Sequence, residues 1–477
     1  MMMPDYATIR ERMKATGIGF AGIEGAWWLP ATEPFVLPTQ VERDLHAIAA
    51  AIFLLFDVVT ELYGTTAGAA AGLNALLEHK VPSHLLGLVS SGRVEGVRPD
   101  FQLVVEHHAT DPRARRYRLM ATELEICPSA HGFAHAMQVG YGLPPDLVQG
   151  FADYLAGREL LFVGTAQWSE FLLEQLAFCR ALAEVGARGR VLYDLPQATL
   201  TAEIEQRQRW QPPIFGVNAK TPAWEEGISR RLAQHRLAPY WDNGTQWPTD
   251  VGNAVLFRFG YLDCFAPNHL QYFQAWQEAG ATWLNPAHFI LDSKVILAAL
   301  QLPAIRARIA LQSAQALQVL DRTIPATRLL TTATLAELLA QRPAWVVKFA
   351  GYDQQQQAWG GRSVQIGADH TDVSWQSMLE KYLVAPCPVV AQRLAPSLQS
   401  DIAFFDSNHA EHWLQQGHTR LRVFFLRHAK ADAQHDVEGR PVLRSTIVAG
   451  AHLTVAGGSK QVSEATDAVQ APVLFLA

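Results

Sequence analysis

The run Glu159-Leu160-Leu161-Phe162-Val163-Gly164 indicates the fold class of this chain. It has the pattern of a short apolar strand closed by a glycine. A helical pattern follows over residues 169–185, and a second strand pattern covers residues 189–193. Strand, helix and strand at this spacing are typical of a βαβ unit, in which the two strands are parallel. The sequence therefore predicts a mixed α/β fold.

The chain on either side of this unit carries further elements. Residues 1–90 are mainly helical in pattern, and the apolar stretch 41–63 is predicted to be one helix. Its most apolar part, residues 47–56, is too short to cross a bilayer, because a membrane-spanning helix needs roughly 20 residues. We interpret it as a buried helix and expect no membrane role. Helices are predicted at 131–140, 269–278, 293–300 and 333–341, and strands at 98–105, 118–126, 255–259, 281–284, 345–349, 388–392, 421–426 and 441–448.

Composition narrows the classes of function. The chain has 477 residues, of which 49% are hydrophobic and 18% are charged, and its formal net charge is −6. Such a composition is ordinary for a globular protein, and no block of lysine and arginine suggests a nucleic-acid partner. The four cysteines form no CxxC pair, which argues against a zinc ribbon or a disulfide framework. Reduced cysteines and a polar N-terminus favour a cytoplasmic location.

Two lysines and a glycine loop in the last third suggest a phosphate-binding site. Lys294 begins an apolar helical pattern, and Lys348 lies inside the strand pattern of residues 345–349. Gly360 and Gly361 follow in a short loop. Lysine supplies cations to triphosphate oxygens, and glycines allow backbone N–H groups to approach them. Each piece alone has an ordinary explanation, such as a solvated strand lysine or a turn, but their order and spacing favour nucleotide binding.

Acidic residues on two earlier strand patterns suggest a metal site. Arg98 and Asp100 share one face of the first pattern, and Glu123 and Glu125 share one face of the second. Mg²⁺ prefers hard oxygen ligands and typically bridges phosphates to a few carboxylates. Adjacent strands would place Asp100, Glu123 and Glu125 together as magnesium ligands. The alternative is an ordinary solvated strand face.

Other candidate sites are weaker. His131 and His135 are four residues apart on a predicted helix, but the glutamate of an HExxH zinc motif is missing. Arg444 lies on a late strand, where it would bind an anionic substrate group or form a structural salt bridge. The sequence contains neither a GxSxG elbow nor a Walker A motif, which argues against a serine hydrolase and a P-loop NTPase.

The order of these motifs resembles that of the ATP-grasp ligases, specifically the circularly permuted, glutathionylspermidine-synthase-like branch, here without an amidase domain. In that branch an Arg-x-Asp-Phe strand and a Glu-x-Asn or Glu-Leu-Asp strand precede the lysine-bearing segments. Arg98-Pro99-Asp100-Phe101 is similar to the first element, and Glu123-Leu124-Glu125 to the second. Lys294 and Lys348 resemble the two ATP lysines. The motifs are spread over residues 30 to 460.

The same resemblance extends to two further positions. Residues 359–364, which include Gly360 and Gly361, are similar to the mobile glycine loop of that branch, and Gln392 is similar to the hinge before its adenine pocket. The backbone of residues 389–392 would then run beside the adenine ring.

The resemblance implies a function and a role for each residue. It implies an ATP- and Mg²⁺-dependent ligase that joins a small-molecule or peptide carboxylate to an amine through an acylphosphate. Lys294, Lys348, Gly360, Gly361 and Gln392 would bind ATP, Asp100, Glu123 and Glu125 would bind Mg²⁺, and Arg98 would stabilise the transition state. Two alternatives remain open: a nucleotide-binding or regulatory protein that has lost ligase chemistry, and a phosphotransferase acting on a hydroxyl acceptor.

The resemblance also implies a division of the chain. We expect a helical segment over residues 1–90. Residues 91–285 would hold the metal-ligand strands and a βαβ substrate-side domain. Residues 286–477 would form the nucleotide-binding region with a glycine-loop lid.

Overall fold

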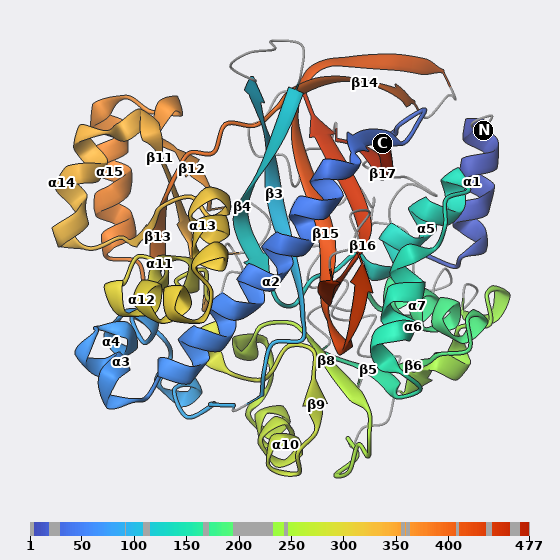
Figure 1. Cartoon of the computed structure of the whole chain (residues 1–477), viewed down its shortest axis with the longest axis horizontal. Coiled ribbons are helices and arrows are strands. Elements are labelled where there is room, and N and C mark those ends of the chain that lie inside the picture. Colours follow the sequence, from blue (N-terminus) through green and yellow to red (C-terminus); the bar gives the residue numbers. More distant parts are fainter. Residues whose placement is uncertain are drawn as a thin grey trace.

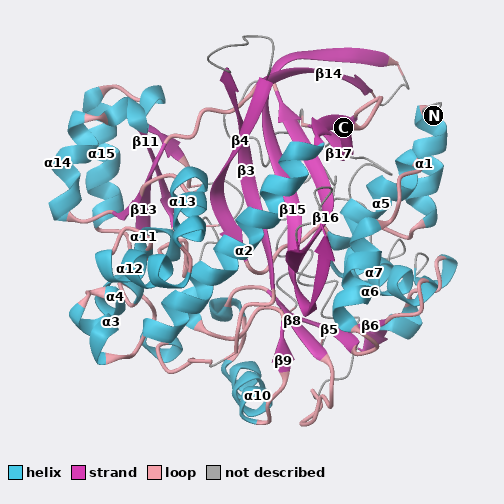
Figure 2. Ribbon diagram, in the orientation of Figure 1, coloured by secondary structure: helices cyan, strands magenta, loops and turns pink. Residues whose placement is uncertain are grey.

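Three β-sheets organise the part of the chain that the structure describes (Figure 2). The computed structural model describes residues 4–18, 29–90, 92–107, 115–165, 171–193, 232–242, 247–353, 358, 363–406, 410–435, 441–457 and 468–476. At residues 107, 115, 429–435 and 441–445 it describes the backbone alone. Helices cover these sheets, so the predicted mixed α/β fold is confirmed.

The largest sheet, the main sheet, has eight strands that come from distant parts of the sequence (Figure 1). Along its main path the order is β1-β17-β16-β15-β3-β4, while β14 pairs with β15 and β2 pairs with β17. The strands are β1 (Leu29–Pro30), β2 (Phe35–Pro38), β3 (Gly96–His107), β4 (Arg115–Glu125), β14 (Gln399–Phe405), β15 (Glu411–His435), β16 (Pro441–Ala456) and β17 (Val469–Leu476). The strands of this sheet come from all three of the expected divisions of the chain, residues 1–90, 91–285 and 286–477. The sheet therefore crosses the expected boundaries at residues 90/91 and 285/286.

The second sheet contains the βαβ unit that the sequence predicts. Its order is β7-β6-β5-β8-β9, and every pair in it is parallel. The strands are β5 (Glu159–Gly164), β6 (Arg188–Leu192), β7 (Trp241–Asp242), β8 (Val255–Phe259) and β9 (Thr282–Trp283). Helix α7 (Leu172–Glu184) connects β5 to β6 and packs on β6. The nearby helices are α5 (His131–Tyr141), α6 (Asp146–Leu155) and α10 (Pro267–Glu278).

The third sheet is small and antiparallel, with the order β10-β13-β11-β12. Its strands are β10 (Thr327–Leu329), β11 (Trp345–Phe349), β12 (Gln365–Ile366) and β13 (Val389–Arg393). Trp345 and Val347 of β11 belong to a core shared with helices α14 (Thr332–Ala340) and α15 (Asp372–Leu383). Since side chains alternate along a strand, Val346 and Lys348 project from the opposite face.

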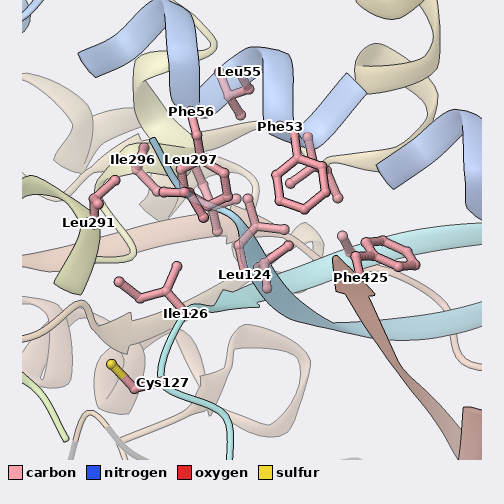
Figure 3. Packing of buried hydrophobic residues seen from close by; sticks show 14 of the residues in the cluster. Phe53, Leu55, Phe56, Leu124, Ile126, Cys127, Leu291, Ile296, Leu297 and Phe425 are labelled. Atoms are coloured by element: carbon pink, nitrogen blue, oxygen red, sulfur yellow. The ribbon is translucent and has the colours of Figure 1, made fainter. Parts of the chain in front are cut away.

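A long helix, α2 (Thr39–Leu62), packs against the main sheet and forms the centre of the largest core (Figures 1 and 3). Phe53 and Phe56 of α2 lie in one cluster with Leu124 of β4 and Leu297. Since Leu124 points into this core, Glu123 and Glu125 project from the other face of β4. By length and composition α2 would also pass as a membrane span, but 56% of its most apolar window is buried. It packs as the buried helix that the sequence predicts.

The segment that carries Lys294 differs from the prediction. A single helix was expected over residues 293–300. Instead a 3₁₀ turn covers Phe289–Asp292, and helix α11 starts at Ile296. The backbone N–H of Lys294 donates to the carbonyl oxygen of Ala350 at 2.7 Å, so this residue is tied to the chain that follows β11. The remaining described helices are α1 (Tyr6–Ala15), α3 (Thr66–Ala70), α4 (Leu73–Leu77), α11 (Ile296–Ala299), α12 (Pro303–Gln312) and α13 (Ala314–Thr323).

Candidate active site

A cavity of about 340 Å³ lies between the main sheet and the small antiparallel sheet. One wall comes from β3, β4 and the β14–β15 region, and the other comes from β11, β12, the end of β13 and the chain that follows β13. Its lining residues are Gln102, Thr122, Glu123, Lys294, Val346, Lys348, Ala358, Ser363, Val364, Ile366, Gln392, Arg393, Leu394, Ala395, Pro396, Ser397, Gln399, His418 and Arg420. Lys294, Lys348, Glu123 and Gln392 are thus brought together, as the sequence predicts for a nucleotide site.

The two lysines reach this cavity from separate elements. Lys348 lies on the face of β11 opposite the helices, and its Nζ donates to the carbonyl oxygen of Thr122 at 2.7 Å. The ladder between β3 and β4 skips Thr122, which leaves its backbone irregular at this point. The Nζ of Lys294 lies 2.8 Å from Oε1 of Glu123 and donates to the carbonyl oxygen of Ala358 at 2.6 Å. Both ammonium groups are therefore fixed at the wall of the cavity.

The charges in this cavity influence one another. Burial acts to raise the pKa of Glu123, but Lys294 and Lys348 outweigh it, and the pKa of Glu123 is lowered. Burial lowers the pKa of Lys348 to about 8, although Glu123 opposes the shift. Glu123 is therefore ionised and Lys348 mainly protonated at neutral pH. The site offers positive charge to a phosphate chain.

Asp100 has a different environment, in which three arginines surround it. Its carboxylate lies 3.3 Å from Arg420 Nη1, 3.3 Å from Arg422 Nε and 3.8 Å from Arg98 Nε. Burial acts to raise the pKa of Asp100, but Arg422, Arg98 and Arg420 outweigh it and lower this pKa to about 2. Asp100 is buried and does not line the cavity.

Glu125 is also withdrawn from the cavity. Its Oε1 accepts the backbone N–H of Cys127 at 2.9 Å, and its Oε2 accepts the hydroxyl of Tyr261 at 3.1 Å. Burial raises the pKa of Glu125 to about 7, and the neighbouring charge of Glu123 adds to this shift. The interactions of Glu125 are therefore those of a structural group rather than a free ligand.

These positions correct the predicted magnesium site. Within the described part of the chain, no three His, Cys, Asp or Glu side chains form a group that could hold a metal ion. Asp100 is enclosed by guanidinium groups, and Glu125 is bound to Tyr261 and to the backbone. Glu123 alone of the three lines the cavity. The set Asp100, Glu123 and Glu125 therefore does not fit as one metal centre, whereas Glu123 fits as a single carboxylate ligand beside nucleotide phosphates.

The other predicted site residues have varied outcomes. Arg98 is buried, donates from Nη1 to the carbonyl oxygen of Ser129 at 2.5 Å, and does not line the cavity. Gly360 and Gly361 lie outside the described residues, although Ala358 and Ser363 on either side line the cavity. The role of the glycine loop therefore stays a prediction.

Gln392 lines the cavity but has a positioning contact that the sequence did not show. Its Oε1 accepts from Lys348 Nζ at 3.2 Å, and its Nε2 donates to Thr327 Oγ1 at 3.0 Å. The backbone of residues 389–392 pairs with β10 on one side and with β11 on the other, and its expected contact with adenine stays a prediction. The end of β13, with Gln392 and Arg393, and residues 394–397 that follow it line the cavity.

The remaining candidates do not join this site. His131 and His135 are buried, and burial lowers the pKa of both, to about 4 for His135. The backbone of Arg444 is part of β16, but its side chain lies outside the described residues.

Two residues near the site were missed from the sequence. Arg420 and Arg422 lie on β15, and β15 pairs with β3 so that Arg422 faces Asp100 directly. The signal was local: in Thr419-Arg420-Leu421-Arg422 the buried Thr419 and Leu421 alternate with two arginines that share the other face of the strand.

Comparisons with known proteins support the fold. The sequence matches no protein-family model and no curated protein. The structure is similar to a glutathione synthetase-like effector, GSS30, of Globodera pallida in its apo form, with a TM-score of 0.53, 11% identity, and coverage of 98% of this chain and 96% of that chain. A "putative gamma-glutamylcysteine synthetase" of Methylobacillus flagellatus overlaps at a TM-score of 0.34, 12% identity and coverage of 84% and 85%, which is too weak to support an argument. At this identity the likeness establishes a shared fold, and the glutathionylspermidine-synthase-like branch stays a prediction.

Proposed function

We propose that this chain is an ATP-dependent carboxylate–amine ligase that forms an amide bond through an acylphosphate. One observation carries the proposal: Lys294 and Lys348, from separate elements, line one cavity together with Glu123. Two buried ammonium groups beside an ionised carboxylate suit a triphosphate whose charge is shared with a divalent cation. The glutathione synthetase-like fold supports the same class of chemistry by analogy.

The reaction would run in two balanced steps. A carboxylate oxygen of the acid attacks the γ-phosphorus of ATP, the bond from that phosphorus to the ADP oxygen breaks, and an acylphosphate forms. The amine nitrogen then attacks the acyl carbon, the bond to phosphate breaks, and nitrogen loses a proton. Lys294 and Lys348 would hold the phosphate oxygens during transfer, since positioning and charge stabilisation dominate phosphoryl-transfer catalysis.

Within this proposal Glu123 is the residue that would hold Mg²⁺. It lines the cavity, its pKa is lowered, and its carboxylate lies beside Lys294. The metal would neutralise charge on the phosphates. Gln392 would orient the ammonium group of Lys348 through the contact between Oε1 and Nζ.

A second candidate function is a nucleotide-binding protein that has lost ligase chemistry. The environment of Glu125 favours it, because that carboxylate is engaged by Tyr261 and the backbone N–H of Cys127. Both functions require nucleotide binding, and only the ligase requires turnover with an acid and an amine.

The first experiment is calorimetry with MgATP on wild type and Lys348→Ala. Loss of one charge-assisted contact should weaken binding roughly 10- to 100-fold. Lys381→Ala is the matched control, because Lys381 is an exposed lysine on α15 beside the same small sheet. Equal affinity of Lys348→Ala and wild type would show that the nucleotide site is assigned to the wrong residues.

The second experiment measures ADP release over a matrix of acids and amines. A ligase releases ADP and phosphate only when both an acid and an amine are present. Tight MgATP binding without ADP release in any combination favours the second candidate function.

A further inference from the structure

A cluster of arginines lies at one end of the cavity and takes no part in the function proposed above. This arginine cluster consists of Arg98 on β3 and of Arg420 and Arg422 on β15. The pairing of β3 with β15 sets Arg422 opposite Asp100, and strand alternation puts Arg420 on the same face as Arg422. The three guanidinium groups lie 3.3 to 3.8 Å from the carboxylate of Asp100.

The members of the cluster have different positions relative to the cavity. Arg420 lines it, and its side chain is 13% exposed. Arg422 does not line the cavity, and its Nη1 donates to Thr454 Oγ1 at 2.7 Å. Arg98 is anchored by the carbonyl oxygen of Ser129. One guanidinium group of the cluster therefore lines the cavity, and the other two lie close to the same carboxylate, that of Asp100.

The charges at this end of the cavity are unequal. The three guanidinium groups lie around the carboxylate of Asp100, and Arg98 also interacts with the charges of Glu125 and Glu174. The ammonium group of Lys348 is close enough for its positive charge to interact with Arg420, which contributes to the lowered pKa of Lys348. Glu123, the carboxylate on the cavity wall, is already paired with Lys294. Lys294, Lys348 and Arg420 thus place three cations on the wall of one cavity, an arrangement that favours an anionic ligand.

The chemistry of arginine specifies the kind of anion. A guanidinium group presents a rigid fork of N–H donors that matches the two oxygens of a carboxylate or two oxygens of a phosphoryl group. Lys294 and Lys348 are point charges suited to phosphates of the nucleotide itself. Arg420 is on the main-sheet side of the cavity, and Lys348 is on the small-sheet side.

We propose that Arg420 binds an oxyanion of the reacting groups, either the substrate carboxylate or the phosphoryl group that it receives, and that Asp100 serves as the counter-ion that orients Arg420 and Arg422. This inference rests on the proposed ligase function and deepens it by assigning the acid-side subsite. It gives Asp100 the role of a positioning residue rather than a metal ligand. Arg422 and Arg98 act through Arg420 and Asp100.

The test measures anion binding to the full chain saturated with MgADP. Inorganic phosphate represents the transferred group, and acetate represents the carboxylate. In Arg420→Gln the affinity for at least one of them should fall roughly tenfold or more, while Arg420→Lys, which keeps the charge, should lose less. A loss for phosphate alone assigns the subsite to the phosphoryl group, and a loss for acetate alone assigns it to the carboxylate.

Controls separate this result from a general effect of charge or folding. Arg328→Gln removes one positive charge from β10, where the arginine is half exposed and pairs with Glu337. It should leave both anion affinities unchanged. MgADP affinity reports folding and should stay within about twofold in all of these variants. Unchanged binding of both anions in Arg420→Gln, or an equal loss in Arg328→Gln, overturns the proposal.

Asp100→Asn tests the role of the counter-ion. We expect weaker anion binding, because Arg420 and Arg422 lose their shared anchor, and an unchanged Mg²⁺ requirement for ADP binding. A tenfold or larger rise in the Mg²⁺ concentration needed for ADP binding would make Asp100 a metal ligand and overturn this role. If wild type binds no MgADP, the proposed function fails, and titration of phosphate alone against the same variants still tests the anion subsite.

Discussion

Buried charge occurs in two regions of this molecule, and the two regions differ in how it is balanced. The enclosed region lies beside the parallel sheet and contains Arg258 of β8, Asp292 and His131. Arg258 and Asp292 form a bidentate pair at 2.6 and 3.0 Å, and both side chains are 0% exposed. Asp292 also accepts the backbone N–H of Leu262 at 2.6 Å. The positive charge of Arg258 is thus balanced by the negative charge of Asp292.

The cavity region contains Asp100, the arginine cluster, Lys294 and Lys348. Among the described residues that line the cavity, the cations Lys294, Lys348, Arg393 and Arg420 outnumber the carboxylate of Glu123. Burial alone therefore does not mark a functional site, since the most deeply buried ion pair belongs to the enclosed region. Unequal charge next to open volume is the feature that separates the two regions.

The largest effect should come from breaking the enclosed pair. Asp292→Asn leaves the guanidinium group of Arg258 buried without its charge partner, which should cost about 3–5 kcal/mol in the free energy of unfolding. Urea denaturation followed by circular dichroism measures this loss. Asp292 immediately precedes Ser293 and Lys294, so MgATP affinity should fall as well.

An exposed bidentate pair provides the control for this prediction. Asp321 accepts from Arg306 Nη1 at 2.6 Å and from Nη2 at 2.8 Å, with side chains 42% and 35% exposed. Asp321→Asn should cost less than about 1 kcal/mol, because solvent screens the pair. Equal costs for Asp292→Asn and Asp321→Asn would remove the distinction between enclosed and solvated pairs.

The two regions also differ in how much of them the sequence revealed. The βαβ pattern and the strand around Lys348 depend on local periodicity, and both appear where they were predicted. Strand alternation also placed Glu123 and Glu125 on one face of β4, opposite the buried Leu124. The roles of Glu123 and Lys348 at a nucleotide stay predictions.

The arginine cluster could not be predicted, because it depends on pairing between distant strands. Asp100 and Arg422 are cross-strand neighbours although they lie 322 positions apart in the sequence. Local patterns give no register between two such distant strands, and the register comes from the packed sheet. For the same reason the sequence assigned Asp100 and Glu125 to a metal. Alternation gives the side of a strand to which a carboxylate points, but not the cation or hydroxyl that it meets there.

A smaller effect is expected where the two regions touch. Gly351 follows β11 with φ +154°, and a Cβ built there would lie 2.8 Å from the backbone oxygen of Asp292. Gly351→Ala must therefore shift the backbone on which Lys294 is anchored. We expect a loss of about 1–3 kcal/mol in unfolding free energy and weaker MgATP binding. Gly252→Ala is a control for positive φ alone, since nothing lies within 4 Å of its Cβ. If Gly351→Ala keeps normal stability but loses MgATP binding, the packing of Gly351 against Asp292 determines the geometry of the cavity without contributing to the stability of the fold.

The smallest effect should be a pH-dependent one inside the enclosed region. His131 is 1% exposed, and its ring lies 4.7 to 5.4 Å from those of Phe151, Phe162, Phe178, Phe257 and Phe424. Burial lowers the pKa of His131 well below 6.5, and the charge of Arg98 adds to this shift. The folded chain therefore keeps this imidazole neutral at pH values where the unfolded chain protonates it. Stability is lost as pH falls below about 6.5, by roughly 1.4 kcal/mol per pH unit for one such group.

His131→Phe removes this titration and should flatten that part of the pH dependence. Urea unfolding of both proteins from pH 8 to pH 5 gives the difference in their unfolding free energies. Repacking around the larger ring adds a constant offset, which the data above pH 7.5 measure directly, because the imidazole is then neutral in both states. Below pH 6.5 wild type should lose stability relative to the variant. A difference that stays constant down to pH 5 would mean that His131 is protonated in the folded protein. It would then be a buried cation without a carboxylate, and the enclosed region would share the charge imbalance that otherwise distinguishes the cavity.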